Sequence, residues 1–311
     1  MGKEIRQAYG EALVKYGENN QNVVVLDADV SSSTKSCLFG NRFPERFFNV
    51  GIAEANMMSM AAGLATVGKI PFVNTFAVFI TSIGLISARA FGSYSHIPVK
   101  MAGAYGGLSD AFDGPSHHSV EDIAIMRSLP NYKVYVASDV VLTDWLVKNA
   151  IEDPNPMYIR LSRDSMPDLY SEGTQFTDGK GIVVREGKDA TIIACGLMVS
   201  TAVAAAEQLE KEGISVRVVD MFCIKPLDTQ LILRCAKETG AIISAEEHSV
   251  IGGLGGAVAE TLCVNAAVVP MGFVGIQDTH GECGPYKTLL KAYGLDADSI
   301  IKTVKETVSR K

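Results

Sequence analysis

Closely spaced cysteine pairs and long apolar segments are both missing from the sequence of 311 residues. The six cysteines show no Cys-x-x-Cys spacing and lie mostly among apolar residues, which predicts buried free thiols in a reducing compartment. No apolar run reaches the length needed to span a membrane, and the N-terminal residues lack the apolar core of a signal peptide. We therefore expect a cytoplasmic protein that is neither exported nor inserted in a membrane.

An excess of positive charge is also missing. The chain has 28 Lys and Arg residues against 35 Asp and Glu residues, for a formal net charge of −7. Such a protein does not offer the broad basic surface that binds nucleic acid, so no nucleic-acid partner is expected. The composition, 47% hydrophobic and 20% charged, is that of an ordinary globular protein, and the length allows two domains.

Short apolar segments alternate with segments of helical periodicity along the whole chain. Such alternation, with nearly continuous apolar strands, predicts an α/β protein with a mostly parallel sheet covered by helices. The alternation stops in the polar stretch 164–180, which reads as a linker, and a second and smaller alternating unit follows. We expect a first domain over 1–170, a linker over 171–184 and a second α/β domain over 185–311.

The stretch 47–58 contains the first candidate for a catalytic residue. An apolar run ends at Gly51 and a helical pattern starts at Ile52, so Glu54 is predicted in the first turn of a helix that follows a strand. An isolated acid at this position is usually an exposed capping residue. The apolar neighbours of Glu54 indicate burial instead, and a half-buried carboxylate at the carboxyl end of a strand is typical of an α/β active site.

A glycine-rich loop over 103–118 contains the second group of candidates. Loops of this length inside a compact domain are usually functional, although a turn with a capping Ser-His pair is an alternative. His117 can transfer a proton near neutral pH, and Asp113 can bind sugar hydroxyls. Arg163 follows a predicted strand and can bind a phosphate through paired N–H groups, while either it or Arg160 could equally be a surface charge.

Two further patterns have ordinary structural explanations when they are considered alone. Phe76 and Phe79 have the i, i+3 spacing of core residues in a helix. The glycine-rich segment 252–256 lacks the G-x-G-x-x-G spacing of a dinucleotide-binding loop, so we expect it to serve tight helix packing.

Several segments taken together resemble the carboxyl-terminal half of transketolase, a thiamine-diphosphate enzyme. The motifs that carry this resemblance are, in chain order, Gly51-Ile-Ala-Glu54-Ala-Asn-Met, Phe72-Val-Asn-Thr75-Phe76-Ala-Val-Phe79, Asp113-Gly-Pro-Ser-His117, Arg127-Ser-Leu-Pro-Asn131, Leu161-Ser-Arg163, and Glu246-Glu-His248-Ser with Gly252-Gly-Leu-Gly. The resemblance covers essentially the whole chain. It implies a pyrimidine-binding domain over 1 to about 170, followed by the carboxyl-terminal transketolase domain over 185–311.

The resemblance implies that this chain binds the pyrimidine half of thiamine diphosphate. Glu54 matches the glutamate that hydrogen-bonds the aminopyrimidine ring nitrogen and so activates the cofactor. Phe76 and Phe79 match the aromatic residues that pack against the same ring. Asp29 matches an acid near the cofactor at a subunit interface.

The resemblance also implies a set of substrate-binding residues. His117 and Asp113 match positions that contact the substrate, with His117 also a candidate catalytic residue. Arg6, Ser33 and Arg163 match positions that bind the phosphate of a sugar phosphate.

Some features depart from the family pattern. Tyr105 replaces a histidine that holds donor hydroxyls, Phe112 replaces an acid, and Ser82 replaces an aromatic residue, so the preferred sugar stays open. The sequence contains no Gly-Asp-Gly segment followed by an asparagine, which in the family binds the diphosphate and its metal. We therefore expect no metal ligands on this chain and Mg²⁺ or a similar ion on a separate N-terminal transketolase subunit. Self-dimerisation within a heterotetramer is expected.

The sequence thus predicts the C-terminal subunit of a split transketolase, which transfers a two-carbon ketol unit from ketose phosphates to aldose phosphates. Three alternatives stay open: the β subunit of a thiamine-dependent 2-oxo acid dehydrogenase, a fragment like deoxyxylulose-phosphate synthase, and an inactive transketolase-like scaffold. The Asp-Gly-Pro-Ser-His loop and Leu-Ser-Arg163 favour a sugar phosphate over a 2-oxo acid. The presence of Glu54 argues against an inactive scaffold.

Overall fold

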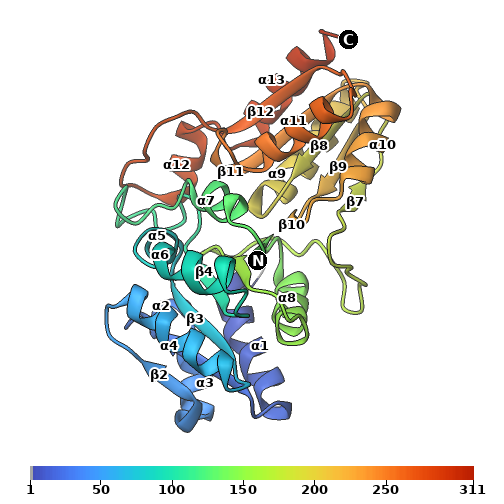
Figure 1. The fold of residues 1–311 in the computed structure, drawn as a ribbon. Coiled ribbons are helices and arrows are strands. Elements are labelled where there is room, and N and C mark those ends of the chain that lie inside the picture. Colours follow the sequence, from blue (N-terminus) through green and yellow to red (C-terminus); the bar gives the residue numbers. More distant parts are fainter. Residues whose placement is uncertain (1–2) are drawn as a thin grey trace.

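The computed structural model describes residues 3–311, which form two β-sheets with helices packed on them (Figure 1). The first sheet has seven strands in the order β10-β5-β6-β4-β3-β1-β2, and the second has five in the order β12-β11-β8-β9-β7. The strand bounds are β1 Val23–Asp27, β2 Phe47–Asn49, β3 Ile70–Phe76, β4 Lys100–Ala104, β5 Lys133–Val136, β6 Met157–Arg160, β7 Ile182–Arg185, β8 Ala190–Ala194, β9 Val216–Asp220, β10 Cys223–Lys225, β11 Ile242–Ser249 and β12 Met271–Ile276.

Helices connect most consecutive strands, as the alternation of the sequence predicts. Their bounds are α1 Ile5–Asn19, α2 Ser31–Thr34, α3 Cys37–Arg42, η1 Pro44–Arg46, α4 Glu54–Thr66, α5 Ala77–Ser82, α6 Leu85–Ser87, η2 Ala88–Tyr94, α7 Asp122–Ser128, α8 Val140–Glu152, α9 Leu197–Lys211, α10 Thr229–Thr239, α11 Leu254–Val264, α12 Tyr286–Ala292 and α13 Ala297–Val308. No helix within 3–311 is long and apolar enough to cross a membrane.

Both sheets are mostly parallel. In the first sheet β1, β2, β3, β4, β5 and β6 pair in parallel, and only β10 is antiparallel to its neighbour β5. In the second sheet only β7 is antiparallel to its neighbour β9. The predicted fold class, a mostly parallel α/β domain followed by a smaller α/β domain, is confirmed.

Strand β10 lies well inside the second half of the sequence, yet it extends the first sheet. The sequence did not predict this strand, because three residues are too few to show a strand periodicity. Its last residue, Lys225, donates from Nζ to the carbonyl oxygens of Arg127, at 3.0 Å, and Leu129. A lysine at this point satisfies free carbonyl groups at the end of α7.

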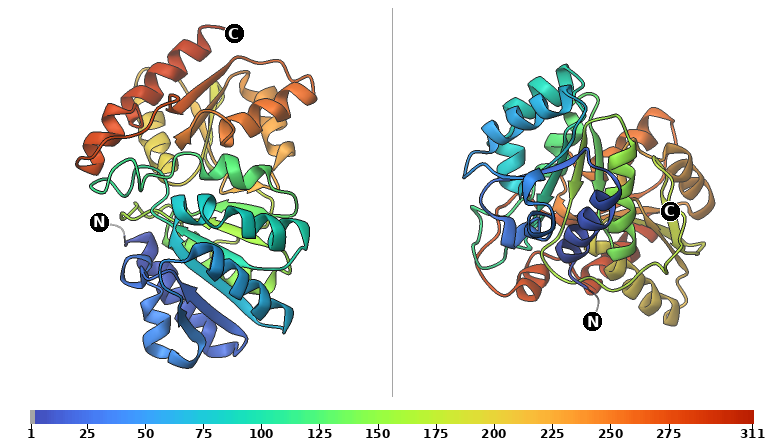
Figure 2. Two further views of the ribbon diagram at one scale, coloured as in Figure 1. Left: turned by 60° about the vertical axis from the view of Figure 1, so that its left-hand side comes forward. Right: turned by 90° about the horizontal axis from the view of Figure 1, so that it is seen from below.

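The two sheets share a hydrophobic core. One continuous cluster of buried side chains contains Met101 of β4 and Tyr158 of β6 together with Ile193 of β8 and Val219 of β9. Figure 2 shows the two halves stacked on one another, with the segment after β4 running between them. Burial of this shared apolar surface stabilises their relative position.

Two details differ from the sequence-based expectations. The helical pattern of residues 78–91 predicts a single helix, but the structure divides it into α5, α6 and the π-helix η2, with a break near Gly84. All six cysteines are free, but Cys263 and Cys283 are exposed and only three thiols are fully buried.

Candidate active site

The predicted site residues follow the carboxyl ends of neighbouring strands. Strands β2, β1, β3, β4 and β6 lie side by side and run parallel, so their carboxyl ends meet at one edge of the first sheet. The chain leaves β2 toward Glu54, β3 toward Phe79, β4 toward Tyr105 and β6 toward Arg163. This edge is where ligands bind in open α/β sheets.

Glu54 is the first residue of α4 and its side chain is buried, with 3% of the residue exposed. Gly51 precedes it with a φ of 72°, a left-handed conformation that turns the chain from β2 into the helix. Among the described residues the one hydrogen-bond donor to its carboxylate is Thr75 Oγ1, at a long 3.4 Å. The Glu54 carboxylate therefore retains capacity to bind a ligand group in a desolvated position.

Four aromatic rings form a wall that begins at Phe76, the residue after the Thr75 that contacts Glu54. The Phe76 ring stacks on Tyr105 with centroids 4.5 Å apart, and it lies 5.8 Å from Phe79. The His117 ring meets Phe79 edge-on at 5.2 Å and accepts or donates a hydrogen bond at Nδ1 with Ser116 Oγ, 2.9 Å away. A buried carboxylate beside aromatic rings fits a flat, hydrogen-bonding heterocycle such as an aminopyrimidine.

Tyr105 lies between two arginines. Arg6 Nη1 donates to the Tyr105 hydroxyl at 2.6 Å and to the Ser33 carbonyl oxygen at 3.1 Å. The Arg6 and Arg163 guanidinium groups lie 5.5 and 5.1 Å from the centre of the Tyr105 ring. The structure therefore brings together Arg6, Ser33 and Arg163, and two guanidinium groups at one site are suited to bind an anion.

Asp110, which the sequence analysis did not select, lies directly behind Arg163. Its carboxylate is fully buried and accepts from Arg163 Nη1 at 2.9 Å. Burial and the nearby Asp113 raise the pKa of Asp110 to about 6, against the opposing effect of Arg163 and His117. An acid in a polar loop gives no sequence signal that separates it from a solvated one, so only the structure could identify this pair.

The remaining predicted residues lie at exposed positions around this edge. Asp113 is exposed in the loop after β4, and Phe112 beside it is 69% exposed. Asp29 is exposed after β1 and accepts from Asn49 Nδ2 at 2.8 Å. Ser82, at the end of α5, is also exposed.

Arg160 is not a surface charge. Its side chain is buried, and Nε donates to Asp122 at 2.8 Å while Nη2 donates to the carbonyl oxygens of Ser119 and Glu247 at 3.0 and 2.8 Å. The Tyr158 hydroxyl donates to the same Asp122 oxygen at 2.6 Å. Arg160 therefore has a structural position, and Arg163 is the arginine available to a ligand.

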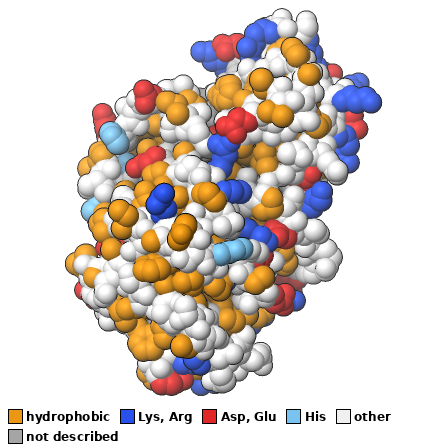
Figure 3. All heavy atoms as spheres, in the orientation of Figure 1, with side chains coloured by type: hydrophobic (Ala, Val, Ile, Leu, Met, Phe, Trp, Pro, Cys, Tyr) orange, Lys and Arg blue, Asp and Glu red, His pale blue; other side chains and the backbone are white. Residues whose placement is uncertain are grey.

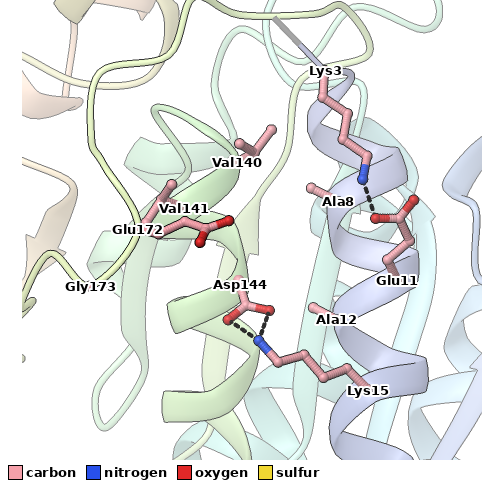
Figure 4. Close-up of a pocket in the computed structure, with 10 residues that line it drawn as sticks. All are labelled: Lys3, Ala8, Glu11, Ala12, Lys15, Val140, Val141, Asp144, Glu172 and Gly173. Atoms are coloured by element: carbon pink, nitrogen blue, oxygen red, sulfur yellow. Dashed lines mark hydrogen bonds and ion pairs between the residues drawn. The ribbon is translucent and has the colours of Figure 1, made fainter.

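The structure offers no metal centre of its own within residues 3–311, where no group of three or more His, Cys, Asp and Glu side chains is arranged to hold an ion. A hollow of about 580 Å³ lies elsewhere, in a groove between α1 and α8 (Figure 4). Four of its five charged side chains form pairs, since Lys15 contacts Asp144 at 2.8 Å and Lys3 contacts Glu11. The fifth, Glu172, also lines the groove.

Comparison with known proteins is consistent with these features. Residues 2–168 match the family described as transketolase, pyrimidine binding domain, and residues 179–300 match transketolase, C-terminal domain. The chain belongs to the transketolase family and contains these two domains. The resemblance inferred from the sequence motifs is thereby confirmed.

Individual relatives align over nearly their full length. A protein of Methanocaldococcus jannaschii named as a transketolase C-terminal section is 41% identical over 99% of this chain and 97% of its own. A 6-deoxy-6-sulfo-D-fructose transketolase subunit of a Clostridium species is 38% identical over 99% of this chain and 95% of its own. A solved structure titled split gene transketolase, inactive beta4 tetramer, is 47% identical over 99% of both chains, with a TM-score of 0.93.

The buried position of Asp110 predicts a pH dependence of stability. Its pKa of about 6 in the folded protein lies above the value of about 3.9 expected in the unfolded chain. Between these values the native state holds a proton that the unfolded state releases, so a rise in pH lowers the free energy of unfolding. Asp110→Asn should remove the contribution of Asp110 and make the slope shallower by at most about 1.4 kcal/mol per pH unit.

Urea unfolding between pH 4.5 and 7.5 measures this slope. Asp298→Asn, at an exposed position of α13, is the matched control and should leave it unchanged. Equal slopes in the wild type and Asp110→Asn would contradict the prediction.

Proposed function

We propose that this chain is the C-terminal subunit of a split transketolase. It would transfer a two-carbon ketol unit from ketose phosphates to aldose phosphates together with a separate N-terminal subunit. The observation that carries the proposal is the convergence at one sheet edge of the buried Glu54 carboxylate, an aromatic wall and two arginines. The alignment with subunits and sections of transketolases over nearly their full length supports the division into two chains.

The proposed cofactor is thiamine diphosphate, which when bound supplies a nucleophilic carbon and an electron sink for ketol transfer. Glu54 would hold a proton at its carboxyl group next to the aminopyrimidine ring, because its carboxylate has spare hydrogen-bonding capacity in a desolvated place. Phe76 and Phe79 would pack against that ring, and Asp29 would lie near it at a subunit interface. The diphosphate and its Mg²⁺ or similar ion would be held by the N-terminal subunit.

The proposed substrates are sugar phosphates. Arg6 and Arg163 would bind the phosphate group with Ser33, and the 37% exposure of the Arg163 side chain leaves part of its guanidinium accessible. Asp113 and His117 would contact the sugar hydroxyls, and His117 would move a proton during transfer. The sugar named for one relative carries a sulfonate group, which is also an anion with tetrahedral geometry and which two guanidinium groups would bind in the same way.

The proposed assembly is a heterotetramer built on a self-dimer of this chain. Figure 3 shows hydrophobic side chains gathered over the lower part of the molecule, where the first sheet and its helices lie. The exposed large hydrophobic residues between the end of β2 and the end of η2 are Ile52, Met60, Val67, Ile83, Ile86 and Tyr94. A large contiguous apolar surface marks a protein interface, and we assign self-association to this face. The solved relative whose title describes an inactive beta4 tetramer is a precedent for self-association without activity.

The experiment that tests the proposal compares the chain alone with the chain plus an N-terminal transketolase subunit. The chain alone should self-associate, bind no measurable thiamine diphosphate in calorimetric titration with Mg²⁺, and show no ketol transfer. The mixture of the two subunits should bind the cofactor and transfer a ketol unit in a coupled assay. Tight cofactor binding by the lone chain, or an active lone chain, would overturn the division of the site.

Replacement of Arg163 tests the sugar-phosphate assignment. In the two-subunit enzyme, Arg163→Ala should raise KM for phosphorylated substrates about 10- to 100-fold, roughly 1.5–3 kcal/mol for a charged hydrogen bond. Turnover of an unphosphorylated ketol donor should barely change.

Two variants control for stability in this test. Asp110→Asn/Arg163→Ala avoids leaving the buried Asp110 carboxylate unpaired, and it should show the same selective loss. Arg42→Ala removes an exposed arginine that pairs with Glu18, and it should behave as wild type. Equal losses on phosphorylated and unphosphorylated substrates would count against a phosphate-binding role.

Replacement of Glu54 tests cofactor activation. Glu54→Gln keeps the shape and a hydrogen bond but does not exchange a proton. Deuterium exchange at the thiazolium C2 of the bound cofactor should therefore slow by about 10²- to 10⁴-fold, with a nearly unchanged melting temperature. If Glu54 only stabilises the start of α4, the loss is instead about 0.3–1 kcal/mol of stability, with an exchange rate within about threefold of wild type.

A further inference from the structure

The loop that begins at Tyr105 and carries His117 is closed by backbone pairing two residues after Tyr105. Gly107 and Ser119 form an antiparallel bridge, with N–H to O distances of 2.8 and 3.0 Å in the two directions. The segment between them, 108–118, leaves the first sheet and runs toward the second half of the molecule (Figures 1 and 2). The conformation of this segment therefore depends on the residues of the second half that it contacts.

Glu247 of β11 meets the base of this loop. Its Oε1 atom accepts from the Leu108 backbone N–H at 2.8 Å, and its Oε2 atom accepts from the Tyr286 hydroxyl of α12 at 3.0 Å. Glu247 is only 3% exposed, and burial raises the pKa of its carboxyl to about 7. Burial of a carboxylate without hydrogen-bond donors costs free energy. The two donors, the Leu108 N–H and the Tyr286 hydroxyl, are therefore essential to the position of Glu247.

The loop approaches Glu247 so closely that glycine is required. Gly107 has a φ of 70°, and a Cβ atom on it would lie 2.4 Å from Glu247 Cδ. Two further contacts from the second half hold the loop. The Gly284 N–H donates to the Ala111 carbonyl oxygen at 3.0 Å, and a Cβ on Gly114 would lie 2.2 Å from Cys283 Sγ.

We propose that Glu247 is a positioning residue of the ketol-transfer site, which acts by fixing the loop that carries Tyr105 and His117. The second domain thereby sets the geometry of the substrate-facing side of the site, although it supplies none of the predicted substrate contacts. The catalytic part of this inference rests on the proposed function. The inference that Glu247 fixes the conformation of the loop does not rest on the proposed function.

The adjacent residue Glu246 provides a matched control. It is also buried on β11, but its carboxylate accepts from the Leu254 and Gly255 N–H groups, both at 2.7 Å, at the start of α11 in its own domain. The two neighbouring buried carboxylates on β11 therefore accept hydrogen bonds from different elements, Glu246 from the start of α11 and Glu247 from the loop at Leu108. Removal of each should disturb only the element that it holds.

Hydrogen exchange of the full chain measures the loop directly. Glu247→Ala should accelerate exchange of the Leu108 amide and the surrounding segment 105–119 about tenfold or more, because the amide loses its acceptor. Glu247→Gln should restore most of the protection, since its amide oxygen can still accept from Leu108. Glu246→Ala should accelerate exchange at the start of α11 and leave 105–119 as in wild type.

A variant that keeps the carboxylate covers the case in which Glu247→Ala does not fold. Tyr286→Phe removes one of the two donors and should accelerate exchange of the Leu108 amide by a smaller factor. Unchanged exchange in 105–119 for Glu247→Ala, or for Tyr286→Phe where the first variant is unfolded, would overturn the proposal. Equal acceleration of this segment in Glu246→Ala would also overturn it, because the effect would then be general destabilisation.

The two-subunit enzyme tests the catalytic consequence. Glu247→Ala, or Tyr286→Phe in its place, should lower kcat/KM for ketol transfer, while C2 deuterium exchange, which depends on Glu54, stays within about threefold of wild type. Loss of both together would show that the whole site is disturbed and would contradict a positioning role. A wild-type enzyme without ketol transfer would refute the proposed function instead, while the hydrogen-exchange result would still decide the role of Glu247 in the loop.

Discussion

The hydrogen bonds and the ion pair of the buried Arg160 guanidinium connect the two halves at the site, in addition to the shared apolar core. An unpaired charge inside a protein costs several kcal/mol, so this group requires partners around it. Asp122 supplies the opposite charge, and the carbonyl oxygens of Ser119 and Glu247 accept from Nη2. Ser119 closes the site loop and Glu247 belongs to the second sheet. Separation of the halves would therefore leave this guanidinium without one of its acceptors.

Contacts between the two halves also shape the site at the edge of the first sheet. Parallel strands bring Glu54, the aromatic wall and Arg163 to one edge, but the loop with Tyr105 has to be held by something other than strand pairing. Tyr105 has a φ of 62°, a conformation that a tyrosine adopts only where its surroundings fix it. Stacking on Phe76 and the two arginines fix its ring, while contacts from the second half fix the rest of the loop.

Local patterns in the sequence were enough to predict the sheets and the first candidate residue. Alternating apolar and helical segments determine parallel sheets, and the apolar neighbours of Glu54 indicated its burial. Arg160 and Arg163 could not be told apart, because they are three residues apart at the end of the same strand and only their long-range partners differ. The roles of Asp110 and Glu247 were missed for the same reason, because they depend on contacts between segments far apart in the sequence. Strand β10 was missed because three residues are too few to show a strand periodicity.

The charges around the anion site also limit what it binds. Arg163 is paired with the buried Asp110, and Arg6 contacts Glu4 at 3.1 Å as well as Tyr105. Each guanidinium is thus partly neutralised before a ligand arrives, so the proposed anion site would attract anions in general only weakly. A ligand would gain most if its anion met the free N–H groups of both arginines while the rest of the molecule fitted the aromatic wall. Selectivity at the proposed site would then come from geometry more than from net charge, in a chain whose overall charge is −7.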